Sequence, residues 1–101
     1  GIDCAPDQHE KFNRWYDDTH IPMLMRFDEM RKVERFARLG NDAAYPQYLT
    51  LYHFDTPDAF QRYQQSRALA EALEETRGTW AQKGYDRQWR VQYQSTRKFE
   101  R

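Results

Sequence analysis

The chain has 101 residues, which is room for one hydrophobic core and therefore for a single domain spanning residues 1–101. Its 16 basic and 16 acidic side chains cancel, so no general field would draw nucleic acid or an anionic membrane surface to it. The mean hydropathy is low, at −1.17, but seven Tyr, six Phe and three Trp exclude a disordered chain. Because such a core is thin, we expect a homo-oligomer that completes it.

The first predicted element is a helix that begins at Asp7, which follows Pro6 and has Glu10 as a capping-box partner. Aromatic residues then recur at helical spacing and form one buried stripe. The stripe consists of Phe12, Trp15, Tyr16, His20 and Met23. Because Pro22 disfavours helical geometry at the residue before it, we expect the helix to end or bend around His20–Ile21.

Two strands joined by a turn are predicted next. Residues 30–39 fit a strand, although Val33, Phe36 and Leu39 are spaced for a helix nearly as well. Residues 40–42 have the sequence Gly-Asn-Asp, which is typical of a turn. Residues 47–55 are rich in Tyr, Leu, Thr and Phe and form the clearest strand. The two strands are therefore expected to pair as an antiparallel hairpin.

The second half of the chain is predicted to hold a helix and a last strand. Thr56 is an N-cap with Pro57 in the first turn. The helix is expected to break near Gln65–Arg67 and to stop at Gly78. Apolar and polar residues alternate with a period of two over residues 85–94, which predicts a strand of that length.

One more strand at Ile2–Cys4 would complete the order βαββαβ. That order is typical of an α+β, ferredoxin-like subunit with two helices on one face of an antiparallel sheet. Only three residues are available for the first strand, and the chain does not begin with Met. We therefore expect this strand to be short, or to be completed by residues that precede Gly1.

His20 is the first candidate for chemistry. It lies at the end of the aromatic stripe, just before Pro22, where partial burial can move its pKa across neutral pH. Such a histidine suits proton transfer, and Asp17 or Asp18 could orient its ring. Alternatively, His20 only caps the C-terminus of the helix as a cation, and the two acids are only solvated.

His53, on the predicted strand 47–55, is the second candidate. It shares its side of the strand with Leu49 and Leu51. If those leucines face the helices, His53 and His20 can point into one cavity as a catalytic pair. With the opposite parity, His53 faces a dimer interface and has no catalytic meaning.

Several aromatic side chains could line a pocket for a flat, hydrophobic small molecule, with hydroxyl and indole groups as polar handles. These candidate substrate-binding residues are Trp15, Tyr16, Tyr52, Tyr63, Trp80 and Trp89. The alternative is a plain aromatic core in a chain that is poor in Leu, Ile and Val. Arg87 and Arg90 could bind a carboxylate but are more simply explained as surface residues.

Other signals are missing from the sequence. Cys4 is the only cysteine, so we expect no internal disulfide and a reducing, cytoplasmic location. No apolar run is long enough to span a membrane. There is no glycine-rich phosphate loop, no HExxH motif and no metal-ligand spacing, so we expect neither a metal nor a cofactor.

Three segments together resemble the EthD-like dimeric α/β-barrel proteins, a group named after ethyl tert-butyl ether degradation. The segments are FNRWYDDTHIP at 12–22, MRKVERF at 30–36 and YLTLYHF at 48–54. The most specific part is the helix end WYDDTHIP, which is similar to the family pattern of an aromatic residue, three further residues, His, Ile or Val, and Pro. The later strands are generic.

This resemblance implies a ferredoxin-like βαββαβ subunit whose sheet packs against a second copy to close a barrel. It also implies a cleft between the sheet and the helices of each subunit. Relatives include cofactor-independent enzymes that act on small organic molecules, and the histidine that matches His20 is their usual acid/base candidate. The short first strand is the departure from the family pattern.

Two hypotheses follow. In the first, the protein is a cofactor-independent enzyme in which His20, helped by Tyr16, Tyr52 or His53, moves a proton on a small carbonyl-bearing aromatic or cyclic compound. The reaction would be an isomerisation, cyclisation, decarboxylation or elimination in catabolism or secondary metabolism. In the second, it is a non-catalytic accessory protein that holds such a compound. A monooxygenase of the related barrels is a weaker third alternative, because the Asn, Trp and His set of those enzymes cannot be placed here.

Overall fold

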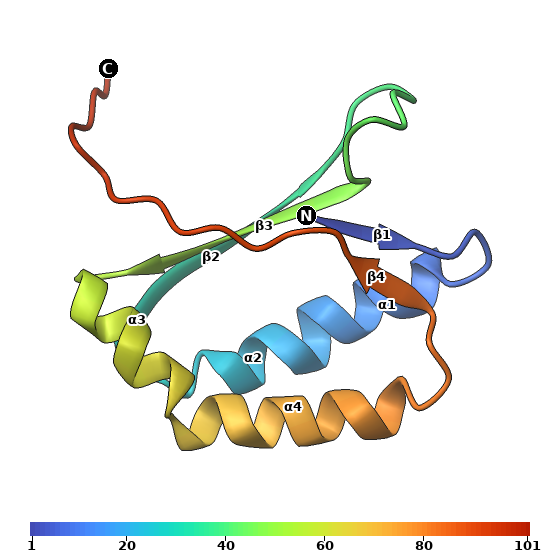
Figure 1. Ribbon diagram of the computed structural model, residues 1–101, viewed down its shortest axis with the longest axis horizontal. Helices are drawn as coiled ribbons and strands as arrows, with labels where there is room; N and C mark the ends of the chain where they lie inside the picture. The colour runs from blue at the N-terminus through green and yellow to red at the C-terminus, as the bar shows by residue number, and fades with distance from the viewer.

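A four-stranded antiparallel sheet with all its helices on one face forms the domain in the computed structural model, which describes residues 1–101 (Figure 1). The strands are β1 (Ile2–Cys4), β2 (Met30–Ala37), β3 (Tyr48–Phe54) and β4 (Tyr85–Arg87). They lie side by side in the order β2-β3-β1-β4, and every pair is antiparallel. The α+β class and the ferredoxin-like βαββαβ order predicted from the sequence are confirmed.

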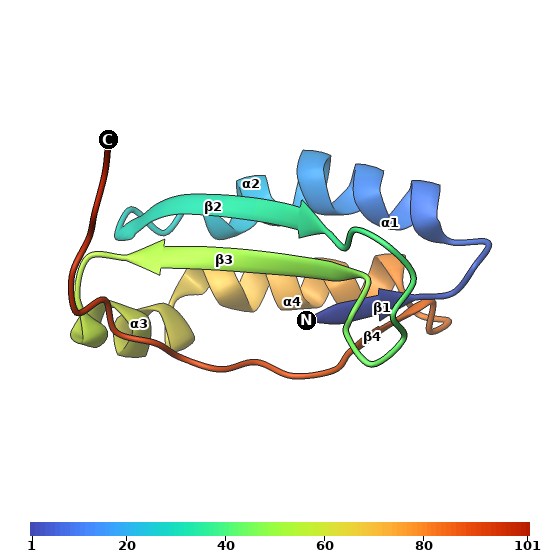
Figure 2. The same ribbon diagram turned by 90° about the horizontal axis from the view of Figure 1, so that it is seen from above.

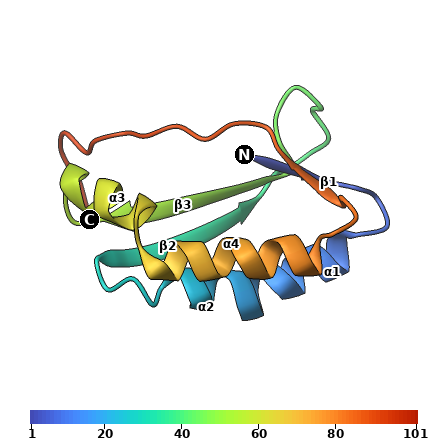
Figure 3. The same ribbon diagram turned by 60° about the horizontal axis from the view of Figure 1, so that its bottom comes forward.

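Two helical segments pack side by side under the same face of the sheet (Figures 1 and 3). The first comprises α1 (His9–Trp15), a π-helical turn η1 (Tyr16–His20) and α2 (Ile21–Leu24), which follow one another without a break. The second comprises α3 (Pro57–Gln64) and α4 (Arg67–Thr79). Figures 1 and 3 show α4 running alongside α1 and α2. None of these helices has the length and apolar character that crossing a membrane requires.

The first helix begins one residue later than predicted, with Gln8 rather than Asp7 at the N-cap. The backbone turns at Pro6–Asp7, where the N–H of Gln8 donates to the carbonyl of Ala5 at 2.9 Å, so Asp7 lies before the helix. Gln8 occupies the N-cap position without a side-chain hydrogen bond. Glu10 pairs with Arg14 one helical turn away instead of reaching back. The predicted capping box is therefore wrong.

The hairpin and the second helical pair follow the sequence closely. Strands β2 and β3 pair along their whole length, and the turn between them contains Gly40 with a φ of +79°. The side chains of Thr56 and Ser66 accept hydrogen bonds from the first turns of α3 and α4, on either side of the predicted break at 65–67. Gly78 does not stop α4, which continues to Thr79.

The last strand is much shorter than predicted. It ends at Arg87, because its neighbour β1 has only three residues and the pairing runs out. The N–H of Gln88 still donates to the carbonyl of Gly1 at 2.7 Å, and the amino terminus donates to the carbonyl of Trp89 at 3.1 Å. Residues 88–101 then run beside the sheet, exposed and without regular structure (Figure 2).

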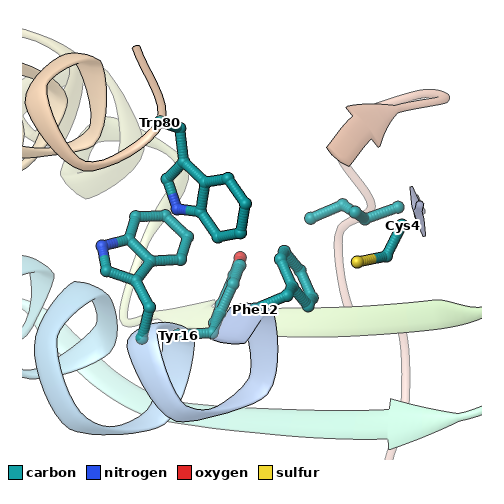
Figure 4. Close-up of a cluster of buried hydrophobic side chains, with 6 residues drawn as sticks. Cys4, Phe12, Tyr16 and Trp80 are labelled. Atoms are coloured by element: carbon teal, nitrogen blue, oxygen red, sulfur yellow. The ribbon is translucent and has the colours of Figure 1, made fainter. Parts of the chain in front are cut away.

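The core between sheet and helices is mainly aromatic and has two parts. Around Phe12, which is fully buried, lie Ile2, Cys4, Trp15, Tyr16 and Trp80 (Figure 4). The second part consists of Leu24, Met30, Tyr63 and Ala72. Tyr52 packs against both parts and joins them. Aromatic side chains thus supply the buried area that the scarce aliphatic residues do not.

Candidate functional site

His20 is the last residue of the π-helical turn η1, between α1 and α2. The N–H of Ile21 donates to the carbonyl of Tyr16, five residues earlier, as in a π-helix. Pro22 accounts for this turn, because it has no N–H to offer the carbonyl four residues before it. The sequence predicted that the helix ends or bends around His20–Ile21; the structure has a π-helical turn there, and the helix continues into α2.

The π-helical turn stacks His20 against Trp15. Two residues five positions apart differ by about 140° around an ordinary α-helix and do not meet. Here the wider turn brings the two rings to a centroid distance of 4.6 Å and an interplanar angle of 24°. The ring of Tyr16 lies edge-on to the imidazole at 5.0 Å. The inserted turn therefore builds the aromatic surroundings of His20.

Burial among these rings lowers the pKa of His20 to about 4, an effect that the nearby carboxylate of Glu75 partly opposes. His20 is therefore neutral at neutral pH. Since the helix continues into α2, His20 is also not a cationic cap at a helix end, which was the alternative considered for it.

A hydroxyl group on α4 favours one tautomer of this neutral imidazole. Thr76 donates its hydroxyl hydrogen to the carbonyl of Ala72 at 2.7 Å. The same oxygen lies 3.5 Å from Nδ1 of His20 and is left to act as an acceptor. This assignment places the ring hydrogen on Nδ1 and leaves the lone pair of Nε2 available to take a proton.

A buried neutral histidine should make stability depend on pH. The unfolded chain protonates His20 near its ordinary pKa of 6.5, whereas the folded chain does so only near 4. The unfolded state therefore binds more protons between these values, and the free energy of unfolding should fall as the pH is lowered from 6.5 to 4. Urea denaturation at pH 4, 5, 6 and 7 measures this fall, and His20→Gln should make it shallower. An identical pH dependence in both proteins would contradict the buried, neutral His20.

His53 does not join His20. Tyr52 points toward the helices and packs in the core, so Leu49, Leu51 and His53 point to the opposite face of the sheet. His53 is exposed there, across from Lys32 on β2. Of the two parities considered, the structure has the second, and the expectation of one cavity shared by both histidines is wrong.

The aromatic candidates separate into three groups. Trp15, Tyr16, Tyr52 and Trp80 gather around Phe12 near His20. Tyr63 lies in the second part of the core, with its ring against Phe54 and Phe60. Trp89 lies beside Gly1, 45% exposed, because the strand that was to carry it ends at Arg87. The structure thus brings four of the six together around Phe12, and two of these, Trp15 and Tyr16, contact the ring of His20.

The hydroxyl groups of Tyr16 and Tyr52 are hydrogen-bonded to each other inside the core. Burial, reinforced by this bond and by the proximity of Tyr16, raises the pKa of Tyr52. Burial also raises the pKa of Tyr63 to about 12. The phenols of Tyr52 and Tyr63 therefore remain protonated at neutral pH and can donate hydrogen bonds to an oxygen atom.

Sequence reasoning missed two charged side chains at this site. Arg35, only 15% exposed, stacks over the ring of Tyr16 at 4.6 Å and pairs with Asp17 at 2.8 Å. Arg35 lies two residues after Val33 on β2, so the alternation of side chains along the strand puts both on the side that faces the helices. This alternation could have indicated from the sequence that Arg35 points inward. Glu75 accepts a hydrogen bond from the indole of Trp15 at 2.7 Å, a contact that the sequence does not indicate.

Two hollows of the surface are open to solvent. One follows the outer side of α1 and includes Trp15 and Thr19 at one edge. The other lies where the ends of β1 and β4 meet. No three His, Cys, Asp or Glu side chains gather as a metal site would require. Neither hollow is lined by His20.

Comparison with known proteins places the chain in a family. A family model described as a domain of unknown function, DUF4286, matches residues 1–90. The chain belongs to the DUF4286 family. No curated protein matches this DUF4286 chain.

A solved structure shows the same fold. The crystal structure of an EthD family protein from Bacillus halodurans C-125 matches with a TM-score of 0.61 and 14% sequence identity, over 84% of the DUF4286 chain and 86% of the other. At this identity the likeness establishes the fold alone. The EthD-like, ferredoxin-like fold expected from the sequence is thereby confirmed, and the roles of the site residues stay predictions.

Proposed function

We propose that this DUF4286 protein is a small cofactor-independent enzyme in which His20 moves a proton on a small carbonyl-bearing aromatic or cyclic compound. The observation that supports this most strongly is the state of His20. It is neutral, stacked on Trp15, and turned by Thr76 so that Nε2 is available. A neutral imidazole with an available lone pair can act as a general base, and the charge of an enolate beside it would raise the pKa of His20 toward the working pH during the step.

The neighbouring groups fit such a step. Nε2 of His20 would take a proton from the carbon next to the carbonyl group. The electron pair of the broken C–H bond would form a carbon–carbon double bond as the π pair of the carbonyl group moves onto its oxygen. The hydroxyl groups of Tyr16 and Tyr52, which are hydrogen-bonded to each other, would donate to that oxygen and stabilise its charge. The imidazolium would be stabilised by the negative charges of Glu75 and of the enolate.

The second half of the reaction returns the proton from His20. Delivery to another carbon completes an isomerisation, and delivery to a leaving group completes an elimination. A cyclisation or a decarboxylation can use the same group with the proton moved in a different order. All of these reactions keep the electrons balanced within the substrate and His20.

One observation supports the alternative of a non-catalytic protein that binds a hydrophobic small molecule. The aromatic rings near His20 pack against one another with centroids 5.3 to 6.3 Å apart; they belong to Phe12, Trp15, Tyr16 and Trp80. The two surface hollows described above are open to solvent. A ligand would then bind by displacing rings or by lying at the edge of this cluster.

A panel of cyclic and aromatic ketones, lactones and keto acids distinguishes the two functions. Each compound is incubated with the protein, and one-dimensional proton NMR spectra are recorded over hours, together with saturation-transfer spectra that report binding. The proposed enzyme is expected to convert at least one compound into an isomer or an elimination product. Binding without any conversion would favour the accessory protein.

We further propose that two copies associate through the outer face of the sheet. On β2 and β3 this face carries Phe36 and Leu51, which are 40% and 42% exposed. Lys32 and Glu34 lie beside them on β2 and pair with each other at 3.5 Å. An apolar pair with a charged border is typical of a surface that a second copy covers.

Replacing Leu51 with lysine is expected to convert such a dimer into a monomer, because two charges would face each other across the apolar centre. Leu73→Lys is a matched control, since Leu73 is 43% exposed but lies on α4, away from this face. Sedimentation velocity should show a dimer for the unchanged protein and for the control, and a monomer for Leu51→Lys. A monomer in all three samples would refute the dimer.

A further inference from the structure

Glu75 links α4 to α1 next to His20. It lies on α4, and both oxygens of its carboxylate are engaged. Oε1 accepts a hydrogen bond from the indole N–H of Trp15 at 2.7 Å, and Oε2 accepts one from the hydroxyl of Thr79. Trp15 lies 60 residues earlier, so the first bond fixes α4 to the end of α1.

The indole that Glu75 holds is the ring on which His20 stacks. The ring planes of Trp15 and His20 are 24° apart at a centroid distance of 4.6 Å. A rotation of the indole about its side-chain bonds would remove this surface and leave the imidazole free to turn. The adjacent residue on α4, Thr76, lies against Nδ1 of the same imidazole. Two neighbouring residues of α4 therefore act on the stacked pair from one side.

The carboxylate of Glu75 has no hydrogen bond to His20 itself. It acts on the imidazole in two ways. It binds the Trp15 ring on which the imidazole stacks, and its negative charge raises the pKa of His20. Asp17 and Asp18, in the same π-helical turn as His20, are exposed, and Asp17 pairs with Arg35. The inward-facing acid on α4, rather than the nearer acids in sequence, is therefore the group that can orient the site.

We propose that Glu75 is a positioning residue, which holds the indole of Trp15 so that His20 keeps one orientation. This inference rests on the proposed function for its meaning, because an oriented imidazole matters only if His20 moves protons. Its structural content, the hold of Glu75 on Trp15 and through it on His20, can be tested without any substrate.

The test compares Glu75→Gln and Glu75→Ala with Glu74→Gln, a control at the exposed neighbouring glutamate on α4. Nitrogen-15 NMR of the Trp15 indole N–H reports its hydrogen bond, and a titration of the ring protons of His20 reports its pKa. Circular dichroism establishes that each variant is folded. Glu75→Gln keeps the shape and one acceptor oxygen, so it remains informative if Glu75→Ala does not fold.

In Glu75→Ala the Trp15 indole signal should move, and its hydrogen should exchange about fivefold faster or more, since one hydrogen bond is lost. In Glu75→Gln the indole signal should stay nearer its original position, whereas the titration of His20 should move to lower pH because the carboxylate charge is gone. Glu74→Gln should change neither signal.

An indole signal and a His20 titration that are unchanged in both Glu75 variants would overturn the inference. If Glu75→Ala does not fold, an indole N–H in Glu75→Gln that keeps the exchange rate of the unchanged protein is sufficient to overturn it, because a neutral amide oxygen is a weaker acceptor than a carboxylate. If both signals change but no compound is converted by the unchanged protein, the positioning contact stands and the proposed enzymatic function fails. With a converted compound in hand, Glu75→Ala should lower kcat more than it raises KM, and Glu75→Gln should recover part of the loss.

Discussion

Replacing His20 with glutamine is expected to lower the turnover of any compound that the protein converts by about 100- to 10,000-fold, the contribution typical of a positioned acid/base group. Glutamine is close to histidine in size and polarity but cannot carry a proton at neutral pH. The far-ultraviolet circular dichroism spectrum should be unchanged, because His20 is only half-buried and its backbone continues through the helix. Initial rates at saturating substrate measure the effect.

His53→Gln is the matched control for this substitution. It makes the same chemical change on the outer face of the sheet, away from the aromatic site. Its turnover is expected to stay within about twofold of the unchanged protein, the range of a surface substitution with a free-energy effect under about 0.5 kcal/mol. Comparable losses in both variants would contradict the placement of the site at His20.

Phe12→Ala is expected to have the largest effect on stability, a loss of about 3–5 kcal/mol in the free energy of unfolding. Phe12 has no exposed surface, and its ring contacts Trp15, Tyr16, Tyr48, Trp80 and Tyr85 at centroid distances of 5.2 to 6.3 Å. Its removal would leave a cavity where α1 meets β3 and β4. Since domains of this size are stable by about 5–15 kcal/mol, the loss is a large part of the total.

Phe99→Ala removes the same side chain from the exposed tail, where Phe99 is 79% exposed. Its free energy of unfolding should stay within about 0.5 kcal/mol of that of the unchanged protein. Urea denaturation followed by tryptophan fluorescence measures both variants. A loss under about 1 kcal/mol for Phe12→Ala would mean that the aromatic cluster around Phe12 is not the core of this domain.

Local signals predicted much of the fold. The hairpin of β2 and β3 was visible from its turn and from the strand-forming residues of 47–55, because these preferences depend on neighbours in sequence. The break between α3 and α4 was visible from the interruption of the apolar pattern, and the structure adds a second cap at Ser66. The βαββαβ order followed from the sequence of these elements.

The length of the last strand could not be read from its own residues. The alternation over 85–94 describes a segment that is able to pair, but pairing also needs a neighbour of equal length, and β1 offers three residues. The sequence also did not determine which residues of β3 face the helices, for a similar reason. Whether Tyr52 or His53 faces the helices depends on how the hairpin lies on α1 and α4, which periodicity alone leaves undetermined.

The sequence predicted the part of the candidate site that lies on the first helix but not the part on α4. The stripe from Phe12 to His20 and the bend at Pro22 mark the aromatic helix, and the structure places Tyr52 and Trp80 against it. The contacts that set the state of His20 come from α4, more than fifty residues later, through Glu75 and Thr76. Such contacts between distant segments arise only when the helices pack, and no local pattern announces them.

The most direct test of the account is solvent deuterium incorporation into a converted compound. The unchanged protein and His20→Gln are incubated with the compound in deuterium oxide, and the carbon next to the carbonyl group is followed by proton NMR. We expect the unchanged protein to exchange that hydrogen for deuterium and His20→Gln to leave it at the uncatalysed rate. Equal incorporation with both proteins would show that another group carries the proton and would contradict the central role of His20.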